Sequence, residues 1–166
     1  AAGLDGLVAG DSLIVSATGV FDSKNVGSGK TVTLASTYSG ADAGNYLITD
    51  QTSATADISA RTLTVSGLTA ANKVYDGTLA ATVNTGATLL DGLVAGDDLS
   101  VASVGQFGSK SAGVAKAVTL SNTFSGSDAG NYSIIDQVGT TADITARALS
   151  TTGIIAAGKV YDGSTV

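Results

Sequence analysis

The sequence contains no cysteine, histidine or glutamate. Without cysteine, neither disulfides nor thiolate metal sites can hold the fold. Because cysteine, histidine and glutamate are all absent, the chain lacks the usual general bases, thiolate nucleophiles and soft-metal ligands of enzymes. We therefore expect a protein that is not an enzyme, with no catalytic, cofactor-binding or metal-ligating residues.

Aromatic and basic residues are also scarce. Five Tyr, three Phe and no Trp leave Val, Leu, Ile and Ala to fill the core. Only eight basic residues stand against fourteen acidic ones, and the net charge of −6 argues against nucleic acid or an anionic membrane as partner. No apolar run approaches the roughly 18–20 residues of a membrane helix, so we expect no membrane insertion. The apolar share of 43% is too high for disorder.

All the acidic residues are Asp. Asp favours turns and caps whereas Glu favours helices, so this composition predicts strands joined by tight turns. A hydrolase built on paired Asp residues remains formally open. The duplicated carboxylates, however, lie in turn motifs or on expected strands, where capping and solvent exposure explain them: Asp5, Asp11, Asp42, Asp50, Asp57 and Asp76.

Apolar residues alternate with other residues in two equivalent stretches. The first contains Leu13, Val15, Ala17, Gly19 and Phe21, and the second contains Leu99, Val101, Ser103, Gly105 and Phe107. A period of two that ends on an aromatic residue is typical of a strand with one buried face. No apolar stripe of helical period outlasts two turns, so the sequence predicts an all-β protein.

The chain is a tandem repeat with a period of 86 residues. Gly40–Tyr46 recurs as Gly126–Tyr132, and 46 of 80 positions are identical when residues 1–80 are aligned with 87–166. In such chains the function usually resides in the array of modules and not in one pocket.

The parity of the apolar positions changes across Arg61, because Ile58 is even and Leu63 is odd. A shift of one residue turns side chains to the opposite face, so the chain must bulge or change sheet there. We place module boundaries near Arg61 and Arg147. Residues 1–60 are then a module that lacks its first strands, 61–146 a complete module, and 147–166 the first strand of a third.

Two loops carry recognisable turn signals. Lys73–Thr78 and its counterpart Lys159–Ser164 contain Asp-Gly after an apolar strand, which predicts a β-hairpin. Lys24–Lys30 contains Gly-x-Gly, but a phosphate-binding loop needs a following helix, and the second copy reads Gly113-Val114-Ala115, without the second glycine. We interpret this loop as a hairpin connection.

Four motifs in a fixed order resemble one family. They are Lys73–Thr78, Leu93–Asp97, Asp128–Tyr132 and Thr141–Ile144. Together they resemble the YDG module and the related mostly-β, glycine-rich (MBG) modules, which recur in very large secreted bacterial adhesins of the filamentous-haemagglutinin-like, two-partner-secretion type. The resemblance implies a stalk or spacer at the bacterial cell surface or in biofilm matrix, and it supplies no catalytic residues.

The expected fold is a series of small immunoglobulin-like β-sandwich modules arranged end to end, with β-grasp-like modules as the alternative. Asp128-x-Gly130-x-Tyr132 is similar to the tyrosine corner of such sandwiches, in which the hydroxyl bonds to nearby backbone. The plainer interpretation is that Tyr46 and Tyr132 are core aromatics whose hydroxyls find a partner.

Two further chemical hypotheses stay open. Calcium could bind Asp42, Asp128 or the Asp97–Asp98 pair, although no EF-hand or nonapeptide calcium motif is present. Lys73 or Lys159 could form an isopeptide bond with an asparagine, although Asn72 becomes Gly158 in the other copy. Turn capping explains these residues better, so we predict no cofactor, with calcium as the alternative.

The function expected from these observations is a structural spacer in a secreted or surface-exposed bacterial adhesin or matrix fibre. Its partners are neighbouring modules of the same or identical chains. A carbohydrate-binding module that contacts a surface glycan or matrix polysaccharide is the alternative. The spare strand at Lys159–Val166, beside a first module without its opening strands, also predicts head-to-tail strand donation into filaments or swapped dimers.

Overall fold

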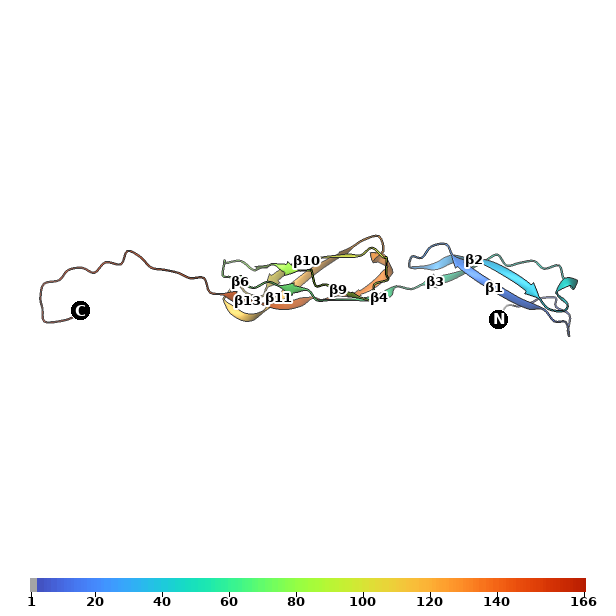
Figure 1. Ribbon diagram of the computed structural model, residues 1–166, viewed down its shortest axis with the longest axis horizontal. Coiled ribbons are helices and arrows are strands. Elements are labelled where there is room, and N and C mark those ends of the chain that lie inside the picture. The colour runs from blue at the N-terminus through green and yellow to red at the C-terminus, as the bar shows by residue number, and fades with distance from the viewer. Residues whose placement is uncertain (1–2) are drawn as a thin grey trace. The chain divides into compact units, whose positions relative to one another are not determined.

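A computed structural model describes residues 3–166 and confirms the all-β fold (Figure 1). Two single 3-10 turns, η1 (Ala43–Asn45) and η2 (Ala129–Asn131), interrupt the strands. Within residues 3–166, no helix has the length and apolarity needed to span a membrane. The strands of the described chain are β1 (Ile14–Phe21), β2 (Gly27–Ser39), β3 (Ser53–Ile58), β4 (Arg61–Ser66), β5 (Thr69–Ala70), β6 (Lys73–Val74), β7 (Ala80–Ala81), β8 (Val83–Asn84), β9 (Leu89–Asp91), β10 (Ser100–Phe107), β11 (Gly113–Ser125), β12 (Tyr132–Ile135) and β13 (Gly139–Thr145).

These strands form four sheets. Their orders are β1-β2-β3, β6-β13-β11-β10-β7, β12-β4-β9 and β5-β8. The pairs β12–β4 and β13–β6 are parallel, whereas β1–β2, β2–β3 and β4–β9 are antiparallel. The loop after Phe21 joins β1 to β2, which confirms the predicted hairpin connection.

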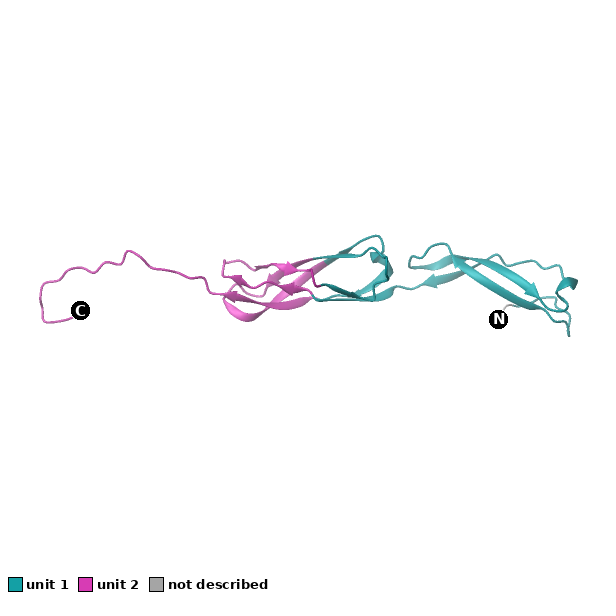
Figure 2. Ribbon diagram, viewed as in Figure 1, with its two compact units in different colours: residues 1–67, 88–102, 123–137 teal, residues 68–87, 103–122, 138–166 magenta. Residues whose placement is uncertain are grey.

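The chain divides into two compact units (Figure 2). Unit 1 comprises residues 1–67, 88–102 and 123–137, and unit 2 comprises 68–87, 103–122 and 138–166. The units do not follow the 86-residue repeat, because both take segments from residues 61–146. The module boundaries near Arg61 and Arg147 therefore remain a prediction from the sequence.

The change of apolar parity at Arg61 corresponds to a change of sheet. β3 pairs with β2, whereas β4 pairs with β12 on one side and β9 on the other. Leu63 and Val65 of β4 are 0% and 3% exposed, so the odd-numbered side chains face the interior of unit 1. The prediction that the chain changes sheet here is confirmed.

The two repeats differ in burial although their sequences match. Unit 1 buries Leu63, Val65, Tyr132 and Asp128, and unit 2 buries Leu68, Phe107, Val118, Leu120, Ala142 and Ile144. Within residues 3–60 no residue is buried. Phe21 is 38% exposed, whereas its counterpart Phe107 is 1% exposed. Equivalent apolar side chains are thus buried in the second repeat and partly exposed to solvent in the first.

The hairpin predicted from Asp76-Gly77 is wrong. Gly77 adopts a positive φ of 79°, as the turn requires. However, β6 and β7 lie at opposite edges of the five-stranded sheet, where β6 pairs with β13 and β7 with β10. Hydrogen bonds from the Lys73 side chain hold this turn, in place of the backbone hydrogen bonds of a hairpin.

Candidate functional site

The Lys73–Ala80 loop is organised around the Lys73 ammonium group. Lys73 Nζ donates to Asp76 Oδ1 (2.9 Å), the Thr78 carbonyl (2.9 Å), Thr78 Oγ1 (3.1 Å) and the Ala80 carbonyl (3.0 Å). Asp76 Oδ1 also accepts the Thr78 backbone N–H at 2.9 Å. The ammonium lies 5.3 Å from the ring centroid of Phe107, within cation–π range. We call this arrangement the lysine loop.

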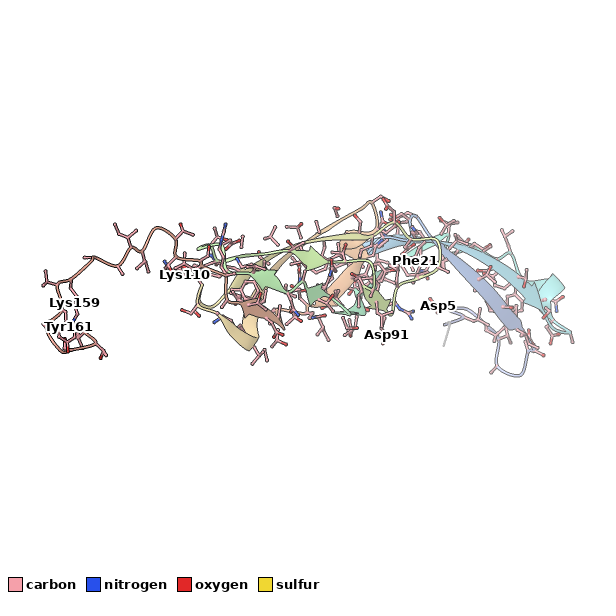
Figure 3. All side chains as sticks on the ribbon, turned by 60° about the vertical axis from the view of Figure 1, so that its left-hand side comes forward. Asp5, Phe21, Asp91, Lys110, Lys159 and Tyr161 are labelled. Atoms are coloured by element: carbon pink, nitrogen blue, oxygen red, sulfur yellow. The ribbon has the colours of Figure 1, made fainter. Side chains whose placement is uncertain are left out.

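The lysine loop forms a second time in the C-terminal segment. Lys159 Nζ donates to Asp162 Oδ1 (2.6 Å), the Ser164 carbonyl (2.8 Å), Ser164 Oγ (2.7 Å) and the Val166 carbonyl (2.9 Å). Residues 146–166 contain no strand, and their side chains are exposed (Figure 3). The hydrogen bonds of Lys159 therefore account for the conformation of this loop, which pairs with no sheet.

Substitution of Lys73 with methionine is expected to raise the pKa of Asp76. Its hydrogen bond to Lys73, followed by those from Thr78, lowers the pKa of Asp76 from 3.8 to about 2. A carboxylate with a lowered pKa stabilises the fold fully above about pH 4, and that contribution is lost as the pH falls through about 2. The variant should lose less stability over this interval, because its folded-state pKa lies nearer the unfolded value.

Carboxyl-resolved NMR titration measures the pKa of Asp76, and unfolding at a series of pH values measures the stability. Lys110→Met is the matched control, because Lys110 is exposed and forms no ion pair within residues 3–166. An unchanged Asp76 pKa in Lys73→Met would show that the Thr78 donors alone stabilise the carboxylate.

The side-chain amide oxygens of Asn72 and Asn131 both accept backbone N–H groups. Asn72 Oδ1 accepts the Asp143 backbone N–H at 2.7 Å. Asn131 Oδ1 accepts the Val26 backbone N–H at 3.0 Å. Within residues 3–166 no hydrogen bond joins Lys73 Nζ to either amide, and its ion pair is with Asp76.

A tyrosine–aspartate pair anchors the turn that precedes each long hairpin. Tyr132 Oη donates to Asp97 Oδ2 (2.6 Å) and accepts the Val94 backbone N–H (3.0 Å). In the first repeat Tyr46 Oη donates to Asp11 Oδ2 and accepts the Val8 N–H at the same two distances. The backbone contact expected of a tyrosine corner is present, but its partner lies 38 residues upstream and not nearby.

A second carboxylate stands beside this pair in both repeats. Asp128 Oδ2 accepts the Asp98 backbone N–H at 2.9 Å, and Asp42 Oδ2 accepts the Ser12 N–H at 2.9 Å. Asp128 is buried, with 8% exposure. We call Asp97 with Asp128, and Asp11 with Asp42, the two Asp clasps.

Lys24 occupies the clasp of the second repeat. Its Nζ lies 2.9 Å from Asp97 Oδ1 and 2.7 Å from Asp128 Oδ1, all within unit 1. The Asp128 and Asp97 carboxylates raise the pKa of Lys24 well above its usual value, and Lys24 is the largest cause of the lowered pKa of Asp128. The Tyr132 hydrogen bond, followed by Lys24, lowers the pKa of Asp97.

Backbone and amide contacts accompany the ion pairs. The Val26 N–H donates to Asn131, as noted above, and Asn131 Nδ2 donates to Asn25 Oδ1 at 3.3 Å. The loop from Asp22 to Val26 is thus held through four contacts at the end of the second repeat. We refer to this set as the Lys24 junction.

The calcium hypothesis named three of the four Asp residues in these clasps, Asp42, Asp97 and Asp128. The Lys24 ammonium lies where a cation bridging Asp97 and Asp128 would lie. Within the described residues 3–166, no group of three or more acidic side chains is arranged to hold a metal ion. Lys24 was not predicted from the sequence as a functional residue, although its repetition as Lys110 was a usable signal.

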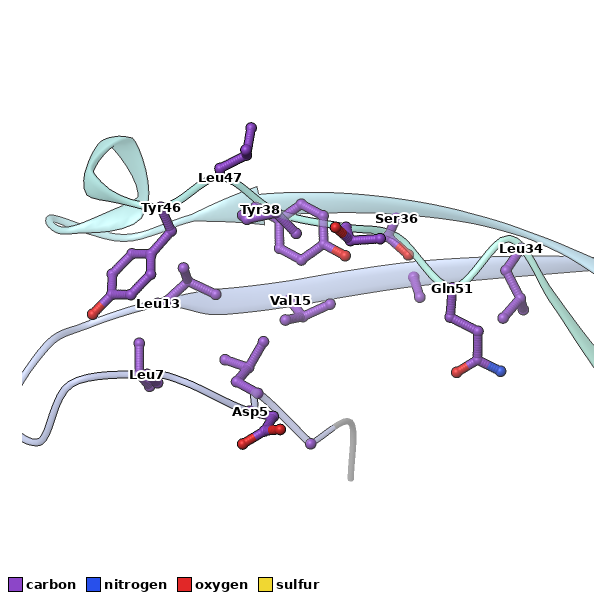
Figure 4. A pocket seen from close by; sticks show the side chains of 15 residues that line it. Asp5, Leu7, Leu13, Val15, Leu34, Ser36, Tyr38, Tyr46, Leu47 and Gln51 are labelled. Carbon is purple, nitrogen blue, oxygen red and sulfur yellow. The ribbon is translucent and has the colours of Figure 1, made fainter.

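An open groove of about 500 Å³ lies in the first repeat (Figure 4). Apolar side chains line it from Val15 of β1, Leu34 of β2, Leu7 and Leu13, and the Tyr46 ring lies at one end. The counterparts of Leu34 and Tyr46 in the second repeat, Leu120 and Tyr132, are buried. The groove is therefore the uncovered equivalent of a core.

Comparison with known proteins gives one match. The YDG domain family model matches residues 1–55 and 59–142. No curated protein and no solved structure matches the chain.

Proposed function

Because the chain belongs to the YDG domain family, we propose that it is a non-enzymatic structural repeat, a stalk or spacer segment of a bacterial cell-surface or secreted adhesin or matrix fibre. Its proposed partners are neighbouring modules of the same kind, outside the cell. A spacer needs a stable module and a defined connection to the next one.

The observation that carries the proposal is the Lys24 junction. A loop of the first repeat places an ammonium group between two carboxylates of the second repeat, and backbone contacts at Val26 and Asn131 accompany it. The contacts join residues 73 to 106 positions apart in the sequence. Such a connection restricts the motion of successive modules, which is what a spacer requires.

The duplicated carboxylates support a structural role as well. Asp11 and Asp97 accept tyrosine hydroxyls, while Asp57 and Asp143 accept the backbone N–H groups of Gly29 and Ala115 at 2.7 Å. These Asp residues stabilise turns in both repeats. That use fits the absence of histidine, cysteine and glutamate from the sequence.

The proposal predicts a narrow distribution of distances between the repeats that depends on Lys24. Spin labels are introduced at Leu47→Cys and Ser133→Cys, which are exposed, equivalent positions within unit 1, in a chain with no cysteine of its own. Double electron–electron resonance on a dilute sample measures the distance distribution. Lys24→Met should broaden it, because the clasp loses its cation.

Lys110→Met is the matched control and should leave the distribution unchanged, because Lys110 forms no ion pair within residues 3–166. A distribution that is already broad in the unsubstituted chain would contradict the spacer proposal. Tight, saturable binding on a glycan array would contradict it in favour of a carbohydrate-binding module.

A further inference from the structure

In the second repeat, β4 lies between two strands. It pairs in parallel with β12, with Arg61 opposite Tyr132 and Leu63 opposite Ile134, and antiparallel with β9. Its Leu63 and Val65 side chains are buried. β4 thus supplies both the strand pairing and the apolar side chains that close this end of the repeat.

In the first repeat, the equivalents of β12 and β9 have no strand between them. Residues 46–49 correspond to β12 and residues 3–5 to β9, and neither stretch forms a strand. Residues from both stretches line the open groove of about 500 Å³. A strand placed between them would cover the groove and satisfy the unpaired backbone groups of both edges.

The chain contains a second copy of the β4 sequence that is not paired. Residues 147–154 correspond to residues 61–68 and retain Arg147, Leu149 and Gly153, with Ile154 in place of Leu68. Leu149 and Ile154 are 92% and 85% exposed, whereas Leu63 and Leu68 are 0% and 1% exposed. The segment thus carries apolar side chains at two of the three positions that are buried in residues 61–68, and Thr151 stands at the position of the third, Val65.

The Asp clasps show the same complementarity. Asp11 and Asp42 accept hydrogen bonds from the equivalent tyrosine and backbone groups of the first repeat, Tyr46 and the Ser12 N–H. No lysine pairs with these two carboxylates within residues 3–166. Lys110, the equivalent of Lys24, is exposed in the loop between β10 and β11 (Figure 3). One clasp lacks its cation and one loop lysine lacks its carboxylates.

The lysine loop provides a third match. The Lys73 ammonium lies over Phe107, and the equivalent pair is Lys159 with Phe21. Phe21 is 38% exposed, and the Lys159 loop already has the hydrogen bonds of the Lys73 loop. This loop needs no rearrangement to lie over an exposed phenylalanine.

We propose that the open groove of the first repeat binds a strand from a second copy of this chain. Residues 147–154 of one copy form a strand in the groove of the next copy, between residues 46–49 and 3–5. At the same contact, Lys110 of the donor copy inserts between Asp11 and Asp42 of the acceptor. The proposal rests on the structural-repeat function above, and the partner it names is a second copy of this chain. The contacts between the two copies would be equivalent to those that the Lys24 junction and β4 make within one chain.

The two surfaces differ, so the contact is heterologous and leaves one donor segment and one groove free after each addition. Assembly therefore continues with concentration unless the geometry closes a ring. Main-chain pairing gives such a strand its affinity, and alternate side chains in the groove give it its specificity.

Sedimentation velocity and small-angle X-ray scattering across a concentration series test the assembly. The unsubstituted chain should increase in mass with concentration, and Leu149→Asp should raise the dissociation constant at least about tenfold. Ile155→Asp is the matched control: Ile155 is 90% exposed, and its counterpart Thr69 is also exposed. A chain that stays monomeric, or an equal effect of both variants, would overturn the proposal.

Disulfide trapping tests the register. Ser133 lies opposite Thr62 in the β12–β4 pair, so Leu47 of one copy should lie opposite Ala148 of another. Oxidising a mixture of Leu47→Cys and Ala148→Cys chains should give the mixed dimer, whereas Leu47→Cys with Ile155→Cys should not. Equal trapping by both pairs would overturn the proposal. So would a glycan that fills the groove while Leu149→Asp has no effect.

These outcomes are separable from those of the spacer proposal. The distance distribution between repeats is measured within one dilute chain, whereas assembly is measured between chains. A narrow distribution in a chain that never assembles would leave the spacer function standing and remove only the inference of strand donation.

Discussion

Phe107→Ala is expected to lower the free energy of unfolding by about 3–5 kcal/mol, the range for deleting a buried aromatic ring. Phe107 is 1% exposed in unit 2, whose other fully buried large side chains include Leu68, Val118 and Ile144. Alanine would leave a cavity beneath the Lys73 ammonium, which lies 5.3 Å from the ring centroid. Chemical denaturation with a fluorescence or circular-dichroism readout measures the change.

Phe21→Ala is the matched control, because Phe21 occupies the same position in the first repeat and is 38% exposed. In dilute samples it should cost about 1–2 kcal/mol, less than Phe107→Ala, because more than a third of Phe21 stays in contact with water. Equal losses for the two variants would show that both repeats are closed to the same degree in solution. If strand donation occurs, the cost of Phe21→Ala should grow with protein concentration.

The strand expected in residues 147–166 is not formed, whereas the hydrophobic pattern was sufficient to predict two long strands. Period-two alternation placed them at residues 13–21 and 99–107, and the structure has β1 at Ile14–Phe21 and β10 at Ser100–Phe107. It could not predict burial, because Phe21 and Phe107 lie in matching contexts. Burial depends on whether another segment covers the face, and β4 and β6 are far from β10 in the sequence.

The site was less accessible to sequence reasoning. Asp-Gly at 76–77 is a strong local hairpin signal, but a non-local pairing of β6 with β13 and the four acceptors of Lys73 replace the ladder. Lys24 is an ordinary loop lysine until the fold brings it to Asp97 and Asp128, 73 and 104 residues away. Tyr132 was identified from its motif, although its partners at Val94 and Asp97 were not.

Gly126→Ala is expected to lower the free energy of unfolding by about 2–5 kcal/mol, from backbone strain and from a steric clash together. Gly126 has a φ of 120°, a conformation that L residues rarely adopt. A Cβ atom there would lie 2.3 Å from the Asp98 carbonyl oxygen and 2.7 Å from its carbon. Both are backbone atoms, so the chain itself must move to relieve the overlap.

The displacement would spread to the Asp clasp. The Asp98 backbone carbonyl accepts the Asp128 N–H at 3.2 Å, and the Asp98 N–H donates to Asp128 Oδ2 at 2.9 Å. Moving Asp98 therefore moves the carboxylate that holds Lys24. Besides the loss of stability, Gly126→Ala should broaden the distance distribution between the repeats as Lys24→Met does.

Gly130→Ala is the control, because a Cβ atom at Gly130 meets nothing within 4 Å and Gly130 lies in the same short segment. It should change stability and the distance distribution little. A variant at Gly126 that lost stability but kept a narrow distribution would show that Asp128 does not fix the junction. The turn at Gly126 thus links two properties that a spacer needs: the stability of the module and the position of its neighbour.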